Sequence, residues 1–462
     1  MSETSVNKTL KIYNSNNELV TLYPNNTAEY VTYSNSNVKS TLDSLVTNSV
    51  TTNTAQSISG VKTFTTSPIL PTPSDTSDTS MNAAPISWIK DELRAEVERT
   101  SQGNNTIVRD NYGYPHYMVV VPRFRMENID SSLGTGVHPA FIVNGVEKSE
   151  ILIGKYIASK GSDGKVKTLA HQNPWTSINF DDALTACKSL GNNFNLVSNV
   201  SLSARALWLW KQFGNHTYYG NTNWGRHHTN TFQTGTMTTT SFLPGDTGNN
   251  STYGGVTLTG SGPVEWFDDG TPNGIADITG NVWEWCTGLR TNDGEFQIIE
   301  NNNSMSQSCD LSNSSTEWKA ILQNGTLVSP GTSDTLKYNG DTDYSTSTTN
   351  TNRDSGKINT EITNYAGPPG NNSYYGYYEN TFSSMSIETG ITIPPIMKQY
   401  GLYPVSSTGV QGYFYIRNYG ERLSLRGGFW RDSSSCGPSA LGLNDHRSRV
   451  GWRIGFRSAF VS

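Results

Sequence analysis

The segment from residue 425 to residue 460 constrains the fold of this chain more than any other. It reads LRGGFWRDSSSCGPSALGLNDHRSRVGWRIGFRSAF. Short anchor-like groups interrupt it at 426–428, at 440–444 and at 454–457, where the chain reads IGFR. The residues between these groups follow neither a helical nor a strand period. A fold that carries so many unpatterned positions usually presents them to a partner, so we expect an exposed binding surface here.

A second segment makes a comparison with a known family specific. Residues 273–285 read NGIADITGNVWEW. Together, the groups GNVWEW, LRGGFW and IGFR resemble the formylglycine-generating-enzyme branch of the C-type lectin fold. The tail also resembles the variable proteins of diversity-generating retroelements, which include phage receptor-binding proteins. The resemblance covers about residues 115–462 and implies an α+β head.

Composition limits the classes of function. The chain has 462 residues and a net charge of −6, so we expect several units and no nucleic-acid partner. It has no run of 18 apolar residues and no N-terminal secretory signal. We therefore expect synthesis in a host cytoplasm and no membrane insertion.

The N-terminal part resembles a phage tail fibre. We interpret residues 1–53 as a virion-attachment segment that binds other tail proteins. Residues 54–85 contain ISGVKTF and SPILPTP, which resemble the shaft unit of tail fibres. Val61, Phe64 and Ile69 cannot bury themselves in so small a unit, so the segment predicts an oligomer, most simply a homotrimer. A disordered linker is the alternative.

Residues 86–113 begin with the clearest helical pattern of the chain. Ile86, Ile89, Leu93 and Val97 repeat at steps of three and four, with charges on the other face. The pattern predicts a helix over 86–99, either a short coiled coil that sets the register of three subunits or a helix packed on its own domain.

Residues 114–462 form the predicted head. Strands are expected at 118–124 and 151–157, and helices at 180–190 and 201–213. The resemblance leads us to expect a few dozen residues between the GNVWEW and LRGG groups, so residues 287–420 are a large insertion. Its Tyr-, Asn- and Gly-rich composition, as in Tyr374–Tyr378, predicts short strands with exposed tyrosines, serving as a contact surface or as an architectural decoration.

Catalysis of the kind found in the enzyme relatives is not expected. They use a cysteine pair, whose two positions fall here on Asp432 and Gly437. Cys436 lies one residue before the second of these positions, and no second cysteine accompanies it. Soft-metal thiolate chemistry needs both cysteine ligands. The cysteines Cys187, Cys286, Cys309 and Cys436 show no CxxC spacing and are expected to be reduced thiols. No zinc site is expected at His227 and His228. An enzyme that acts on surface glycans is a further alternative: no paired carboxylates or Ser/His arrangement stands out, but scattered acids such as Asp268 and Asp269 leave it open.

A cation site is the second candidate chemistry. In the enzyme branch, the turn around GNVWEW binds calcium, and its ligand positions correspond here to Asp277, Gly280, Val282 and Glu284. Oxygen ligands on a glycine-containing turn suit a hard cation such as calcium. The alternative is a structural turn, and no cofactor is required for the function that we predict.

The third candidate is the variable surface. We predict that the positions between the anchors bind a receptor, namely Phe429, Arg431, Asp432, Ser433, Ser435, Pro438, Asp445, His446, Arg449, Trp452 and Arg453. All except Trp452 are residues that adenine mutagenesis of asparagine codons can produce. Residues 421–457 contain seven arginines, no lysine and three acids, hence a net charge of +4. Arg426, Arg447 and Arg457 are expected to hold loops through backbone carbonyls.

These features predict a non-enzymatic receptor-binding protein of a phage tail. Its lectin-fold head would bind a bacterial surface protein or glycan during host adsorption. The alternative is a structural tail or fibre component without direct receptor contact.

Overall fold

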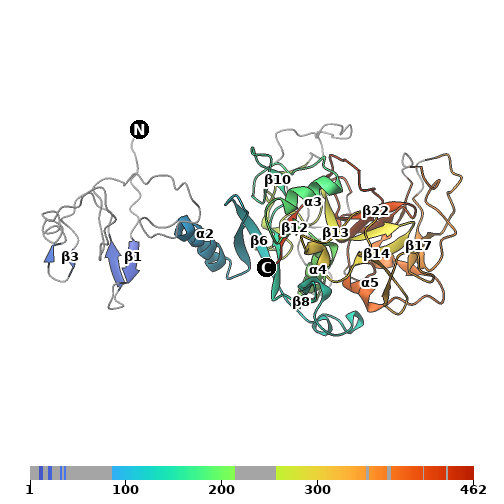
Figure 1. Ribbon diagram of the computed structural model, residues 1–462, viewed down its shortest axis with the longest axis horizontal. Coiled ribbons are helices and arrows are strands. Elements are labelled where there is room, and N and C mark those ends of the chain that lie inside the picture. Colours follow the sequence, from blue (N-terminus) through green and yellow to red (C-terminus); the bar gives the residue numbers. More distant parts are fainter. Residues whose placement is uncertain are drawn as a thin grey trace. The chain divides into compact units, whose positions relative to one another are not determined.

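The chain divides into two compact units, Met1–Ile89 and Lys90–Ser462. The computed structural model describes four short N-terminal strands and then residues 86–213, 256–349, 353–371, 376–408, 410–432 and 435–462 (Figure 1). In the first unit, β1 (Leu10–Tyr13) pairs with β2 (Leu19–Leu22), and β3 (Thr32–Tyr33) pairs with β4 (Ser36–Asn37). The predicted shaft unit and the His227–His228 pair lie outside the described residues.

The predicted helix at 86–99 is confirmed as α2 (Ile86–Thr100). Arg94 and Glu98, four residues apart, form an exposed ion pair of 2.6 Å along its surface. Leu93 and Val97 are half-buried. The coiled coil remains a prediction.

A five-stranded antiparallel sheet forms the first layer of the second unit, in the order β12-β25-β9-β6-β5. Its strands are β5 (Asn105–Arg109), β6 (Pro115–Pro122), β9 (Glu150–Gly154), β12 (Phe194–Leu196) and β25 (Ser458–Phe460). The C-terminal strand β25 lies between β9 and β12. The two strands predicted at 118–124 and 151–157 are therefore neighbours, with small shifts of their ends.

Both predicted helices of the head are present. In α3 (Phe180–Lys188), the Asn179 side chain accepts a hydrogen bond from the Asp182 backbone N–H, and Asp181 and Asp182 stand in the first turn. The second helix, α4 (Asn199–Phe213), buries its Leu202, Leu207 and Leu209 side chains. A short helix, α5 (Pro395–Gln399), lies in the insertion.

A twelve-stranded sheet forms the second layer around the long strand β13 (Trp283–Asn292). Its main path is β19-β21-β23-β22-β13-β14-β17-β18-β20, with β15, β16 and β24 attached beside it. The other strands of this sheet are β14 (Glu295–Ile299), β15 (Trp318–Ile321), β16 (Leu327–Val328), β17 (Lys337–Gly340), β18 (Gly356–Asn359), β19 (Tyr378–Thr381), β20 (Ser386–Ile387), β21 (Tyr413–Ile416), β22 (Glu421–Gly427), β23 (Gly437–Leu443) and β24 (Ile454–Phe456). Sheets and helices are thus mixed, and most strands pair antiparallel, as an α+β fold predicts.

Short elements complete the second unit. They are the hairpins β7 (Ile142–Val143) with β8 (Val146–Glu147) and β10 (Ser159–Lys160) with β11 (Val166–Lys167), and the 3-10 turns η1 (Met126–Asn128), η2 (Ser131–Leu133), η3 (Pro139–Phe141), η4 (Val264–Trp266), η5 (Asn303–Met305) and η6 (Phe382–Ser384).

The insertion at 287–420 forms short strands, as predicted, but it is no peripheral decoration. Its strand β21 pairs in parallel with β23 of the C-terminal segment, and β14 pairs with β13. Tyr378, expected on an exposed surface, is completely buried and packs 6.3 Å from the Tyr338 ring, which is also buried. The expectation of exposed tyrosines is wrong for Tyr378, because its ring completes the core beneath this sheet.

Candidate functional site

The three motifs of the sequence meet along β13. Strand β22 pairs antiparallel with β13, with Glu284 opposite Arg426 and Trp285 opposite Leu425. Strand β24 pairs with β13 in parallel, so Trp283 is opposite Ile454. The GNVWEW, LRGG and IGFR groups therefore form one continuous piece of core.

A buried ion pair joins two of these motifs. The Arg457 guanidinium donates to both carboxylate oxygens of Glu284, at 2.9 Å from Nε and 2.7 Å from Nη2. The same guanidinium donates to the backbone carbonyls of Gly154 at 2.8 Å and Ala276 at 2.9 Å. Neither side chain of the pair is more than 3% exposed. The pair therefore connects both sheets and the GNVWEW turn.

The side chains and backbone groups at the four predicted calcium positions have partners within the protein. Both oxygens of Glu284 are bound to Arg457, and Asp277 Oδ2 accepts a hydrogen bond of 2.7 Å from the Gly260 N–H. Gly280 has a φ of +78° and its N–H donates to the Gly427 carbonyl, while the Val282 side chain is buried. Within the described residues, no cluster of three metal-ligating side chains is found. In this conformation Arg457 therefore occupies the Glu284 carboxylate, which favours the structural turn. Calcium binding itself stays a prediction.

The predicted receptor positions differ in exposure. Arg431 is exposed, and half-buried side chains are found at Asp432, Ser435, Asp445, His446, Arg449, Trp452 and Arg453. Ser433 lies outside the described residues. Phe429 and Pro438 are buried, so they offer no surface in this conformation. Pro438 belongs to β23, a strand that sequence analysis missed because its residues are buried on both faces and show no alternation.

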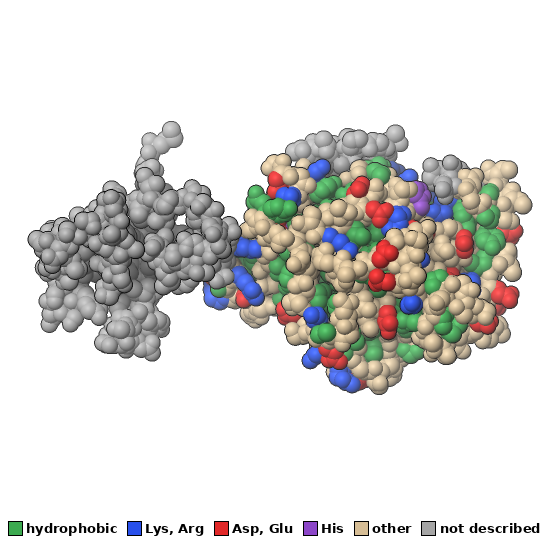
Figure 2. Space-filling model, viewed as in Figure 1, with side chains coloured by type: hydrophobic (Ala, Val, Ile, Leu, Met, Phe, Trp, Pro, Cys, Tyr) green, Lys and Arg blue, Asp and Glu red, His purple; other side chains and the backbone are tan. Residues whose placement is uncertain are grey.

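The accessible candidates surround an aromatic group. The Phe429 and Trp452 rings pack edge to face, with centroids 5.6 Å apart. Arg453 lies over the Phe429 ring at 5.3 Å, and Arg431 lies over the Trp430 ring at 5.9 Å. Figure 2 shows a purple histidine with blue basic side chains beside it, in the region where Figure 1 labels β22. The loops before β23 and before β24 thus present arginines above a rigid aromatic base.

Asp432 supports this surface from within. Its Oδ2 accepts a hydrogen bond of 3.1 Å from the Phe429 N–H, and its own N–H donates to the Phe429 carbonyl. Burial raises the pKa of Asp432 to about 6. The side chain therefore holds the turn at 429–432 in shape.

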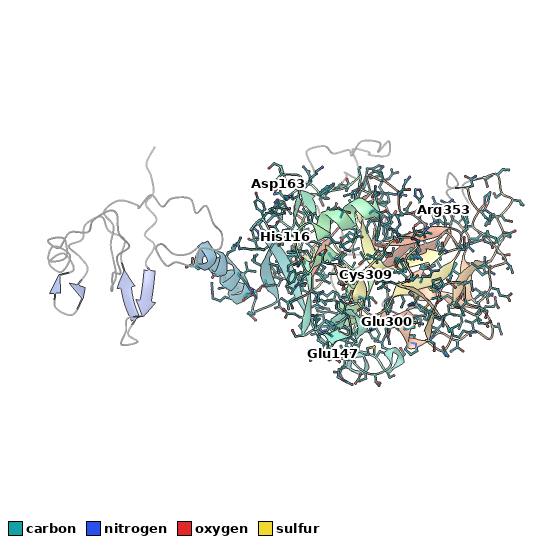
Figure 3. All side chains as sticks on the ribbon, in the orientation of Figure 1. His116, Glu147, Asp163, Glu300, Cys309 and Arg353 are labelled. Atoms are coloured by element: carbon teal, nitrogen blue, oxygen red, sulfur yellow. The ribbon has the colours of Figure 1, made fainter. Side chains whose placement is uncertain are left out.

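The cysteines offer no nucleophile pair. Each of the four is a buried thiol outside any disulfide, in agreement with the prediction of reduced thiols. Cys436 Sγ donates to the Phe429 carbonyl at 3.1 Å, and burial raises the pKa of its thiol. In Figure 3, Cys309 and His116 lie in different parts of the second unit, so they form no thiol–imidazole pair.

The three anchor arginines behave as predicted. Arg426 donates to the carbonyls of Tyr400, Gly401 and Ser439 and to Asn199 Oδ1. Arg447 donates to the Leu311 carbonyl at 2.8 Å.

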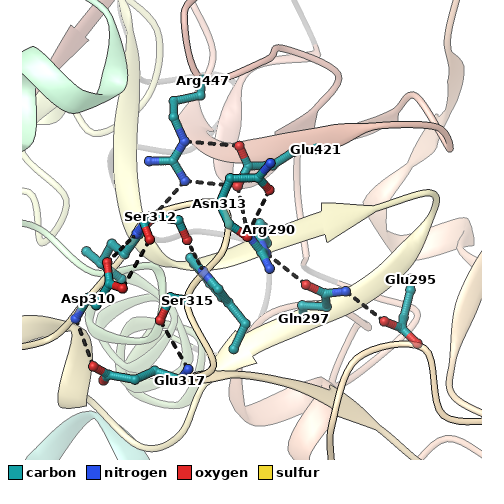
Figure 4. Close-up of polar contacts among 12 residues, drawn as sticks. Arg290, Glu295, Gln297, Asp310, Ser312, Asn313, Ser315, Glu317, Glu421 and Arg447 are labelled. Atoms are coloured by element: carbon teal, nitrogen blue, oxygen red, sulfur yellow. Dashed lines mark hydrogen bonds and ion pairs between the residues drawn. The ribbon is translucent and has the colours of Figure 1, made fainter. Parts of the chain in front are cut away.

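Arg447 also belongs to a charged network. Its guanidinium shares the Glu421 carboxylate with Arg290, at 2.9 Å and 2.8 Å (Figure 4). This network lies on the other side of strand β22 from Arg422, the next residue along the strand.

Sequence analysis overlooked the turn that joins β21 to β22. Arg417 and Arg422 are both buried, and their guanidinium carbons lie 4.9 Å and 5.3 Å from the centre of the Tyr419 ring. In the sequence, Arg422 contributes only to the positive charge of residues 421–457. The available signal was the spacing of two arginines around a tyrosine, which does not reveal burial.

Fold and site define a C-type-lectin-like domain of the formylglycine-generating-enzyme branch. Residues 93–332, just over half of the chain, match the family described as Sulfatase-modifying factor enzyme 1-like domain, and the chain belongs to this family. The matched range includes GNVWEW and ends before the C-terminal segment at 425–460. No curated protein matches the chain. Within the described residues, no helix is long and apolar enough to cross a membrane.

Proposed function

We propose that this protein is a non-enzymatic receptor-binding protein of a phage tail that displays its C-terminal surface to a bacterial surface receptor. The observation that carries the proposal is the arrangement around Phe429 and Trp452. Arg453 lies over the Phe429 ring and Arg431 over the adjacent Trp430 ring, on loops whose ends are fixed by buried strands. Variable side chains on such a frame change the binding specificity without changing the fold.

The location in a virion tail is part of this proposal and rests on the resemblance of the N-terminal and C-terminal segments to phage tail proteins. Residues 1–53 would attach to other tail proteins, and the shaft would assemble a homotrimer. Three heads would then give avidity from modest single-site affinity. A neighbouring reverse-transcriptase gene, with a repeat that matches codons 425–460, would support active diversification of the surface.

An enzymatic role has less support. The positions that correspond to the cysteine pair of the enzyme relatives hold Asp432 and Gly437, and Cys436 is buried against the Phe429 carbonyl. Asp268, one of the scattered acids, is bound to the Arg205 guanidinium at 2.7 Å and 2.8 Å. It is therefore engaged in a structural pair.

Competition for host adsorption tests the proposal. The variant combines Arg431→Ala, Asp445→Ala, His446→Ala and Trp452→Ala. A matched control combines Arg123→Ala, Asp163→Ala, His171→Ala and Tyr112→Ala, which remove the same kinds of side chain from exposed positions elsewhere. Purified wild type and control should block phage adsorption, and the variant should not. Equal blocking by the variant would exclude the C-terminal surface, and no blocking by any protein would favour the structural tail component.

A further inference from the structure

Two buried arginines at the β21–β22 turn have no carboxylate partner. Arg417 is 4% exposed and Arg422 is 2% exposed. Within the described part of the chain, the Nε atoms of both have no hydrogen-bond partner, and no ion pair involves either residue. Arg417 Nη2 donates to the Asn371 carbonyl at 3.1 Å and to the Tyr419 hydroxyl. Arg422 relies on its stacking with the Tyr419 ring.

The other buried arginines of the domain are neutralised or fully bonded. Arg457 lies 2.7 Å from Glu284, Arg205 lies 2.7 Å from Asp268, and Arg290 lies 2.8 Å from Glu421. Arg426 lacks a carboxylate, but backbone carbonyls and Asn199 accept its hydrogen bonds. Burying a charge without such partners is unfavourable. The Arg417–Arg422 pair is therefore short of an acceptor with negative charge.

The acids nearest to this pair are engaged elsewhere. Asp293 Oδ1 accepts a hydrogen bond of 2.7 Å from the Gly420 N–H, and Asp445 lies 3.6 Å from Arg449 Nε. Burial, and then the neighbouring Arg417, lower the pKa of Arg422 to about 10, although Asp445 and Asp293 oppose this change. Neither carboxylate forms an ion pair with Arg422 among the described residues.

A further unbonded polar atom lies beside Arg422. Thr291 is its cross-strand partner on β13, and the buried Thr291 Oγ1 has no hydrogen-bond partner among the described residues. At Gly420, where φ is +63°, a Cβ atom would lie 3.5 Å from Arg422 Nη2, so the guanidinium is in van der Waals reach of this turn. His446, half-buried, is close enough for Arg422 and Arg417 to lower its pKa, after burial as the main cause.

We propose that Arg417, Tyr419 and Arg422 bind an oxyanion group, the carboxylate or phosphate of an acidic polymer on the bacterial surface. A guanidinium fork matches carboxylate and phosphate oxygens in paired hydrogen bonds. The bound group supplies the negative charge that the two arginines lack. The assignment of the group to a receptor rests on the proposed function, because the site adjoins His446 and Asp445 of the predicted receptor surface.

Anion titration of the full-length protein tests the site itself. Inorganic phosphate and sodium glucuronate serve as probes, with sodium chloride keeping the ionic strength constant, and thermal unfolding and calorimetry as readouts. One of the two probes should raise the melting temperature of wild type in a saturable way, and its identity distinguishes a phosphate from a carboxylate source. Arg422→Met should weaken this binding about tenfold or more.

Arg123→Met is the matched control, because it removes the same charge from an exposed position. It should keep the shift. Without added anion, Arg422→Met should be at least as stable as wild type, since it removes an uncompensated buried charge. The site is refuted if neither probe shifts wild type, or if Arg422→Met keeps the full shift.

The adsorption assay separates this inference from the proposed function. If wild type binds the anion but Arg422→Met blocks adsorption as well as wild type, the site exists and takes no part in receptor recognition. If wild type does not bind the anion and the combined surface variant fails to block adsorption, this inference is overturned while the proposed function stands.

Discussion

At the residue scale, the Glu284–Arg457 pair shows how this fold uses buried charge. Its partners lie 173 positions apart in sequence, and the guanidinium also holds carbonyls from two further segments. Such a pair contributes little compared with well-packed apolar side chains, but removing one partner leaves the other charged and buried.

Arg457→Met should therefore lower the free energy of unfolding by about 3–5 kcal/mol. Urea denaturation of the purified protein measures this change. Arg94→Met is the control, because it breaks an exposed pair of α2 and should cost about 0–1 kcal/mol. Similar losses in the two variants would contradict the structural role of Arg457.

His138 makes a second prediction, about acid stability. Its Nδ1 accepts the Ala140 N–H and its Nε2 donates to the Gln399 carbonyl, so the ring must be neutral. Burial lowers the pKa of His138 to about 3. The unfolded chain takes up this proton near pH 6.5, so the stability from neutral His138 is complete above that pH and is lost as pH falls toward 3.

Between pH 7 and pH 4.5, wild type should lose about 2–3 kcal/mol more stability than His138→Gln. Urea titrations at both pH values give the difference. His171→Gln, at an exposed position, should behave as wild type. An equal pH response of wild type and His138→Gln would show that His138 is not the acid-sensitive group.

At the scale of elements, the insertion is part of the core. Tyr378 on β19 is completely buried, and its hydroxyl donates to the Thr342 carbonyl at 2.7 Å. Tyr378→Ala should cost about 3–5 kcal/mol through the cavity that it leaves, and Tyr378→Phe about 1 kcal/mol. Chemical denaturation checks both values. The control is Tyr112→Ala, at an exposed tyrosine, which should change the free energy of unfolding by less than about 0.5 kcal/mol. A comparably small effect of Tyr378→Ala would instead support the hypothesis that the insertion is an architectural decoration.

Local signals predicted the elements that local physics determines. Asp181 and Asp182 marked the start of α3, and the periodic leucines of residues 201–213 marked most of α4. Strand β23 escaped because its residues are small or apolar and do not alternate between apolar and polar side chains. The burial of Arg422 escaped for another reason, since only the pairing of β22 with β13 decides that its side chain is covered.

At the scale of the whole molecule, charge is unevenly distributed. The chain carries −6, while residues 421–457 carry +4. Part of that positive charge is neutralised inside, as at Arg447 and Arg457. The arginines that remain at the surface would attract an acidic partner and mainly increase the rate of encounter.

The oligomeric state of the whole molecule sets how many heads can bind a surface together, and therefore its avidity. The helix α2 carries Leu93 and Val97 on the face that the sequence assigns to a coiled coil. If three chains join there, the full-length protein should have the mass of a trimer in size-exclusion chromatography with light scattering. Leu93→Asp with Val97→Asp should shift it toward monomer, because charges in the seam oppose association. Ala95→Asp, on the exposed face, should leave the trimer intact. A monomeric wild type would instead mean that α2 packs only on its own domain and that the head binds without avidity.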